Sequence, residues 1–295
     1  MQFKWVIELL VLSAVWGSSF MFMRLASPEI GPTPLTFIRC IIATGILGAI
    51  VYFSYKQELK HILTHWWPLT LLAVTNTALP FSLWGYVSLF MESGPMGVIN
   101  ATAPMFSSLI AFVWLKEKLS GSAMFGMALG FTGVTVLLIS PGDDVSIAFI
   151  PALLGLFACA NYGVAACISK AKASGLKPMT VAAGSQFYSA LVLLPFAAFT
   201  WPESMPSTTA ISSTLFLGVA CSGYAFYLYY KLIAEQGIAR TMTNMYLLPL
   251  FAILWGGLFL GEELAMRTAI GGAIILIGVA FTTGYLRLGR KRAEA

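Results

Sequence analysis

The stretch ESGPMGVINATAP, residues 92–104, decides the fold because it recurs as EQGIARTMTNMYLLP, residues 235–249. Residues on either side of this stretch also recur in the second half of the chain, at offsets of 143 to 146. An internal repeat in an apolar chain predicts a transporter whose two halves rock about a site between them. The equivalent pairs outside the stretch are Trp16 and Tyr162, Gly17 and Gly163, Arg24 and Lys170, Phe81 and Tyr224, Trp84 and Tyr227, Tyr86 and Tyr229, Glu117 and Glu262, Gly126 and Gly271, and Gly133 and Gly278.

The composition predicts an all-α polytopic membrane protein. Hydrophobic residues make up 58% of the 295 positions, charged residues 10%, and the mean hydropathy is +0.83. A helix needs roughly 20 apolar residues to cross a bilayer. Five such stretches fall in each predicted repeat, residues 1–142 and residues 143–295, the second repeat ending in a basic tail. The ten stretches are residues 5–24, 33–54, 67–90, 96–115, 121–140, 147–169, 180–200, 211–232, 241–260 and 267–286.

The positions of the basic residues predict the orientation. Lys and Arg near the ends of spanning helices favour the cytoplasmic side. With both termini in the cytoplasm, 14 of the 17 basic residues are cytoplasmic, while Arg24 and Arg267 lie outside and Arg39 lies within the second helix. Because each half has five helices, the two halves then run in opposite directions through the membrane. We expect a multi-pass protein of the cell membrane, the inner membrane in a bacterium.

Several short motifs resemble a known family. These are WGSSF at residues 16–20, Arg39 after Pro34, Leu-x-Glu-x-Leu around Glu117 and Gly-Glu-x-Leu around Glu262. Together with the repeat, they resemble the EamA-like branch of the drug/metabolite transporter superfamily over essentially the whole chain. The resemblance implies ten helices and the export of small metabolites or drugs.

The first helix is also similar to that of the small multidrug resistance proteins. In those four-helix dimers a glutamate three residues before the glycine carries both proton and drug, and here that position is Ala14. The nearest acid is Glu8, about a turn and a half earlier. Glu8 is therefore the acid at which proton coupling is predicted, with exchange and facilitated diffusion as open alternatives. The chain already contains both halves, so a monomer is expected and a homodimer stays open.

Prolines and asparagines recur in the middle of each repeat. Pro104 and Pro249 are predicted inside the fourth and ninth helices, where proline removes a hydrogen bond and loosens the helix. They are either static kinks or hinges for gating. Asn100 and Asn244 precede them by about a turn, and because asparagine is costly in lipid, both should face the interior.

Aromatic and polar residues predict a central substrate cavity. Phe81 and Trp84 share one face of the third helix, as Tyr224 and Tyr227 share one face of the eighth. Packing is the alternative role for these rings, but mid-helix tyrosine hydroxyls need partners that lipid lacks. The other residues predicted to line the cavity are Trp16, Asn100, Asn161, Tyr162, Gln186, Asn244 and Tyr246.

Arg39 is the basic residue placed well inside a predicted span. The free-energy cost of placing its charge within the membrane requires an explanation. It either snorkels to the outer interface or helix-end carbonyls, or provides a counter-charge for a substrate carboxylate or a gate. The equivalent position in the other repeat is Gln186, which is neutral. Glu117 and Glu262 are predicted to be structural, each capping or orienting the next helix.

The sequence predicts neither an enzyme nor a cofactor. The four cysteines lie in apolar helices without metal-ligand spacing. Glu262, Glu263 and Arg267 match an element of CAAX-type membrane proteases, but those enzymes need histidines in membrane helices, and His61 and His65 fall in a loop. The expected partners are a small-molecule substrate and the bilayer, without nucleic acid.

The predicted function is export of a small neutral, zwitterionic or aromatic metabolite, amino-acid-like compounds first, by alternating access. Phosphorylated metabolites such as nucleotide-sugars are the alternative within transporters. Phosphate-bearing substrates usually need several buried cations, whereas Arg39 is the one basic residue well inside a predicted span.

Overall fold

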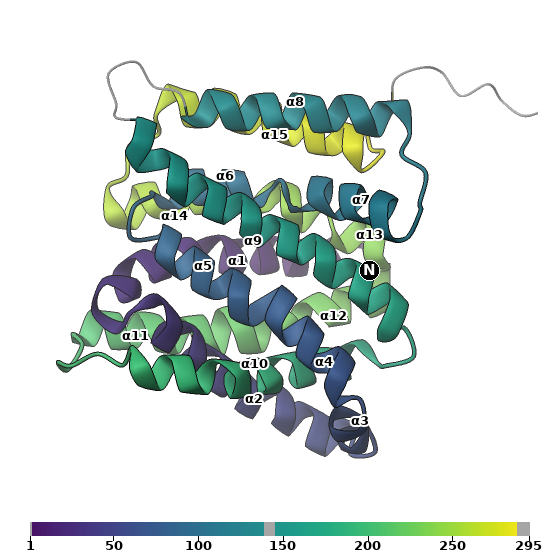
Figure 1. Ribbon diagram of the computed structural model, residues 1–295, viewed down its shortest axis with the longest axis vertical. Coiled ribbons are helices and arrows are strands. Elements are labelled where there is room, and N and C mark those ends of the chain that lie inside the picture. The colour runs from purple at the N-terminus through teal and green to yellow at the C-terminus, as the bar shows by residue number, and fades with distance from the viewer. Residues whose placement is uncertain (1, 139–144, 288–295) are drawn as a thin grey trace, which may run out of the picture.

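The computed structural model describes residues 2–138 and 145–287, which form helices and connecting turns (Figure 1). The apolar composition drives these residues into helices because a spanning helix satisfies its own backbone hydrogen bonds. The elements of the first half are α1 (Gln2–Ile30), α2 (Pro32–Ser54), α3 (Glu58–Thr64), α4 (Trp66–Ala73), η1 (Val74–Ala78), α5 (Leu79–Val87), α6 (Ser93–Asn100), α7 (Ala103–Trp114) and α8 (Gly121–Leu138). Those of the second half are α9 (Val145–Lys172), α10 (Pro178–Phe199), α11 (Thr208–Phe216), η2 (Leu217–Tyr224), α12 (Ala225–Gln236), α13 (Ile238–Thr241), α14 (Asn244–Leu260) and α15 (Met266–Thr282).

The protein is a polytopic membrane protein. Within the described residues, seven helical runs are long and apolar enough to cross a bilayer, and two shorter apolar helices follow them near the C-terminus. The shorter two are α14 and α15. The predicted stretch 67–90 is helical over α4, η1 and α5, which continue into one another.

The helices run side by side, so the molecule has two ends (Figure 1). The Glu262 end, on the left of Figure 1, carries the turns between α1 and α2, α10 and α11, and α14 and α15. The Glu117 end, on the right, carries the start of α1 and the turns from α7 to α8 and α9 to α10. The described chain begins and ends at the Glu117 end, where Ser122 Oγ donates to Leu286 O over 3.3 Å.

The short helix α3 contacts the start of α10 through polar side chains at the Glu117 end. The Glu58 carboxylate accepts a hydrogen bond from Thr180 Oγ1 over 2.8 Å and pairs with Lys177 Nζ at 3.0 Å. The Lys177 bond, followed by the Thr180 bond, lowers the pKa of the Glu58 carboxyl below its usual range.

The helices α8 and α15 form a closely packed pair at one edge of the molecule (Figure 1). A methyl group added to Gly133 would come within 2.8 Å of the Gly271 carbonyl oxygen, and the contact is reciprocal. Small residues allow two helix backbones to approach this closely. The pair lies apart from the helices that surround Arg39.

The two prolines occupy different local structures. Pro104 is not inside a continuous helix, because α6 ends at Asn100 and α7 begins at Ala103, so the proline lies in the first turn of α7. Proline is well tolerated there, since the first amide groups of a helix have no partner within it. Pro249 lies inside α14 as predicted. The helix is interrupted by a turn between α13 and α14, just before Asn244. The predicted loosening is therefore a break that precedes each proline.

Candidate functional site

Two π-helical segments occupy equivalent places in the two halves. The segment η1 begins at Val74 and η2 at Leu217, 143 residues later, the offset that also relates Phe81 to Tyr224. π-helical turns inside longer helices occur frequently at functional sites. The two segments point to the middle of these helices as the place to look for a site.

Arg39 lies buried beside η2. Only 4% of the residue is exposed, its Nε donates to Ser222 Oγ over 2.5 Å, and the guanidinium carbon lies 4.1 Å from the centre of the Phe81 ring. The guanidinium therefore does not snorkel to a helix end, and that interpretation was wrong. A cation over an aromatic face is attracted by the ring quadrupole, more strongly where water is absent. Ser222 comes from the second half, so both halves hold this cation.

Aromatic side chains surround the same region. Trp16 Nε1 donates to Cys221 O over 3.0 Å, next to the residue that binds Arg39. Tyr162 interacts electrostatically with Arg39 and packs against the same hydrophobic core as Trp84. Trp84 is 2% exposed and meets the Phe20 ring at 5.3 Å. Trp16, Arg39, Phe81 and Tyr162 thus lie near η2, with Trp84 in the adjoining core.

Amide side chains are buried without partners. Gln186 and Asn244 are both 0% exposed, and none of their side-chain amide atoms has a hydrogen-bond partner among the described residues. A buried polar group without a partner is costly and calls for an explanation such as a ligand or water. Asn161 differs, since its Nδ2 donates to Phe157 O of its own helix over 2.8 Å. Asn100 is 8% exposed, and its carbonyl oxygen lies 3.9 Å from Cys159 Sγ.

The tyrosines predicted for the cavity at positions 224, 227 and 246 have different surroundings. Tyr224 is 47% exposed. Tyr227 packs on the same cluster as Trp16 and Phe81. Tyr246 forms a hydrogen bond with Thr283 Oγ1 over 2.6 Å beside the end of α15.

Glu8 is a paired carboxylate. Its Oε1 accepts from Lys231 Nζ of α12 over 2.5 Å, and Lys4 Nζ lies 4.0 Å away. Its Oε2 is buried without a hydrogen-bond partner. The acid predicted for proton coupling therefore joins the two halves through an ion pair near the Glu117 end.

The glutamates after α7 and α14 do not cap the helices that follow them, so that prediction was wrong. Glu262 accepts from Ser93 N and Ser93 Oγ, both over 2.9 Å, at the start of α6 in the other half. Its Oε1 also pairs with Arg24 at 2.5 Å. Glu117 pairs with Lys170 at 2.6 Å. The repeat contains a signal for both pairs, since Arg24 is equivalent to Lys170 and Glu262 to Glu117.

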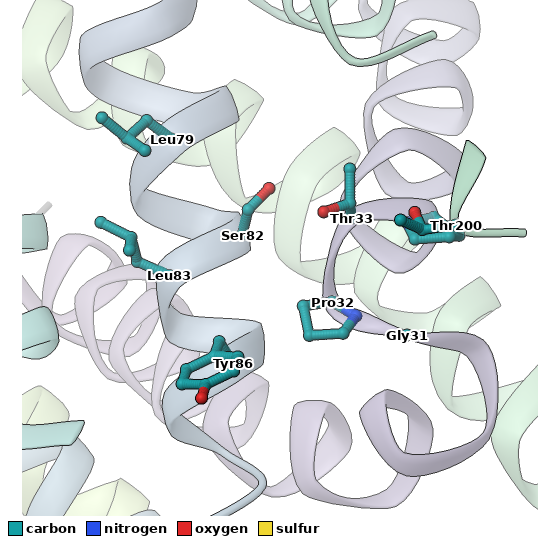
Figure 2. A pocket seen from close by; sticks show the side chains of 9 residues that line it. Gly31, Pro32, Thr33, Leu79, Ser82, Leu83, Tyr86 and Thr200 are labelled. Atoms are coloured by element: carbon teal, nitrogen blue, oxygen red, sulfur yellow. The ribbon is translucent and has the colours of Figure 1, made fainter. Parts of the chain in front are cut away.

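A crevice of about 340 Å³ opens elsewhere, between α5 and the start of α2 (Figure 2). In Figure 2 Ser82 and Thr33 face one another across it, while Leu79, Leu83 and Tyr86 line the α5 wall. None of the predicted site residues lines this crevice. Its wall carries no charged side chain, so it offers less chemistry than the surroundings of Arg39.

A family model matches the chain twice. The EamA-like transporter family model covers residues 3–139 and residues 149–284. Relatives align over nearly the full length. An uncharacterized transporter of Archaeoglobus fulgidus is 22% identical over 281 residues, covering 94% of this chain and 97% of the relative. The uncharacterized transporter YwfM of Bacillus subtilis is 27% identical over 292 residues, covering 97% and 95%.

One relative has a more specific description. It is the "Probable terminal-alkyne amino-acid exporter" of Streptantibioticus cattleyicolor, 25% identical over 296 residues, covering 98% of this chain and 95% of the relative. A solved structure described only as a protein crystal structure matches with a TM-score of 0.67 and 15% identity. The match covers 95% of this chain and 96% of that one, and it supports the fold alone.

Proposed function

The chain belongs to the EamA-like transporter family, and we propose that it exports a small amino-acid-like metabolite, neutral, zwitterionic or aromatic, by alternating access. The observation that carries the proposal is the buried Arg39, bonded to Ser222 of the other half and stacked on Phe81. A site built from both halves changes its access when one half moves against the other.

The proposed topology has ten spans in two inverted five-helix repeats, residues 1–142 and 143–295. The described chain begins and ends at the Glu117 end, which also holds the basic turns, among them Lys56, Lys60, Lys116 and Lys118. Since basic segments stay in the cytoplasm, this end is proposed to face it. The location is proposed as the cell membrane, the inner membrane in a bacterium.

The proposed binding residues are those around Arg39. Trp16, Phe81 and Tyr162 provide aromatic surface, and the unpartnered Gln186 and Asn244 amides provide hydrogen-bonding groups in the interior. Neutral polar groups and one cation suit an amphipathic molecule with a small polar head. The name of the Streptantibioticus relative supports an amino-acid-like substrate.

The proposed movement takes place at the breaks beside Pro104 and Pro249. At each break the α-helical pattern changes to i→i−3 hydrogen bonds, such as Thr102 N to Ile99 O and Thr243 N to Arg240 O, and we propose that the helix bends there. Replacing both prolines with alanine should slow exchange several-fold at unchanged membrane abundance, as measured by substrate counterflow. Wild-type flux in the double variant would contradict the hinge assignment.

The function is tested by efflux from proteoliposomes. Purified protein is reconstituted with a mixed pool of amino acids and small aromatic metabolites inside, and the loss of each compound is followed by mass spectrometry, with and without an inward proton gradient. Protein-free liposomes are the control. We expect selective loss of amino-acid-like compounds, and loss of none of the pool would overturn the proposal. Stimulation by the gradient that is absent from Glu8→Gln would assign the coupling to Glu8.

A further inference from the structure

We infer that the Arg39 guanidinium binds the carboxylate of the transported compound, so that a free carboxylate is required of every substrate. This inference rests on the proposed function, since it names the chemistry of the ligand at the same site. It excludes the neutral compounds, and the aromatic compounds without a carboxylate, that the proposed function still allows.

The first step is that Arg39 is a buried cation without a buried anion. Among the described residues, no carboxylate lies within ion-pair distance of Arg39, whereas Arg24, Lys170, Lys177 and Lys231 all have acidic partners. An isolated charge in the interior of a membrane protein is expensive and marks a functional site. A ligand anion would supply the missing charge.

The second step is that the guanidinium keeps unused donors. Arginine has five N–H donors in one plane, and here the bond to Ser222 Oγ occupies Nε. No oxygen in the described parts of the chain accepts a hydrogen bond from Nη1 or Nη2. The Phe81 ring centre lies 4.1 Å from the guanidinium carbon, and this contact with the ring uses no N–H group as a hydrogen-bond donor to oxygen. Two parallel N–H groups of a guanidinium match the two oxygens of a carboxylate.

The third step is that the surroundings suit a single negative charge. The groups on which the Arg39 charge acts are neutral, namely the thiols of Cys40 and Cys221 and the phenol of Tyr162. The equivalent residue of the second half, Gln186, is also neutral. One cation balances one carboxylate, whereas a phosphate dianion would leave a charge unpaired. The aromatic rings near Arg39 favour an apolar or aromatic remainder.

The test uses ligands that differ only at the head group. Purified protein in detergent is titrated with L-phenylalanine, 3-phenylpropionate, L-phenylalaninamide, phenethylamine and phenyl phosphate, and binding is measured as thermal stabilisation. We expect L-phenylalanine and 3-phenylpropionate to stabilise the wild-type protein and the amide and the amine to have no effect. Equal stabilisation by acid and amide, or no stabilisation by either acid, would overturn the inference. Stronger stabilisation by phenyl phosphate would also overturn it and favour phosphorylated substrates.

Variants connect the binding to Arg39. Arg39→Gln should weaken binding of the two acids about tenfold to about a hundredfold, the loss expected for hydrogen bonds to a charged group. Lys170→Gln is the matched control, because it removes an exposed cation at the Glu117 end, and it should retain the preference for acid over amide. Unchanged acid binding in Arg39→Gln would contradict the inference. If that variant does not fold, the wild-type titration still decides the matter.

Failure of the carboxylate inference can be distinguished from failure of the transport proposal, because the binding test and the efflux test give separate results. Binding of the acids without efflux of any compound would reject the transport proposal and keep the carboxylate site. Efflux of amides or amines at the same rate as the matched acids would reject the carboxylate site and keep the transport proposal.

Discussion

The glutamates that follow α7 and α14 have the same backbone and different surroundings. The amide of Glu262 donates to Gly256 O over 3.2 Å, and that of Glu117 donates to Ala111 O over 3.3 Å, so both helices close with the same wide turn. The Glu262 side chain is 8% exposed and has three hydrogen bonds, whereas that of Glu117 is 47% exposed and bonds only to Lys170.

The comparison separates local from tertiary causes. Equivalent sequences produce equivalent helix ends, but the environment depends on which helix packs against each end. The start of α6 lies against α14, where Ser93 and Arg24 enclose Glu262. At the other end Glu117 and Lys170 remain open to solvent. In the immediate surroundings of these two glutamates, the Glu262 end is therefore closed and the Glu117 end is open to solvent.

The largest effect is expected from Glu262→Ala. Removing this carboxylate leaves Arg24 without its partner and the Ser93 amide without an acceptor, which should cost about 3 kcal/mol of unfolding free energy. The measurement is unfolding by sodium dodecyl sulfate titration in mixed micelles. Glu262→Gln retains an acceptor for Ser93 and should lose less. Wild-type stability in Glu262→Ala would contradict the closed-end description.

The next effect concerns the turn residue one position before each glutamate. Gly261 has φ of 66° and Lys116 has φ of 58°, the left-handed region that favours glycine. A side chain at Gly261 would meet no atom within 4 Å, so substitution there tests the backbone alone. Gly261→Ala should destabilise the protein by about 1 kcal/mol and Lys116→Gly should stabilise it by about 1 kcal/mol. Shifts of the same sign for both variants, in the same titration, would show that the two turns are not equivalent.

A smaller effect is expected from Ser93→Ala, which sharpens the comparison at the closed end. The variant removes the hydroxyl bond to Glu262 and keeps the amide bond, so the loss should be below about 1 kcal/mol. Combined with Glu262→Ala in a double-mutant cycle, its effect should disappear, because the partner is already absent. Additive losses in that cycle would indicate that Ser93 acts independently of Glu262.

The smallest effect is expected from Glu117→Ala at the open end. The pair with Lys170 is exposed on both sides, and such pairs contribute little and are screened by salt. The unfolding midpoint should match wild type at low and high salt. A loss as large as that of Glu262→Ala would show that the two ends are equally closed.

The sequence predicted the positions of the helices, which depend on local composition. It did not predict the side-chain contacts between residues that are far apart in the chain. Hydropathy located the helices, and Arg39 was singled out as a basic residue within a predicted span, with snorkelling to the outer interface as the competing interpretation. The partner of Arg39, Ser222, is 183 residues away. The partner of Glu262, Ser93, is 169 residues away, which is why capping of the next helix was the wrong expectation.

The two π-helical segments give both halves the same kind of backbone irregularity. Each segment has i→i−5 hydrogen bonds in place of the i→i−4 bonds of an α-helix, over five residues in η1 and eight in η2. The segments begin 143 residues apart, within the two regions that the family model matches. The two halves therefore resemble one another in where their helices depart from regular geometry as well as in sequence.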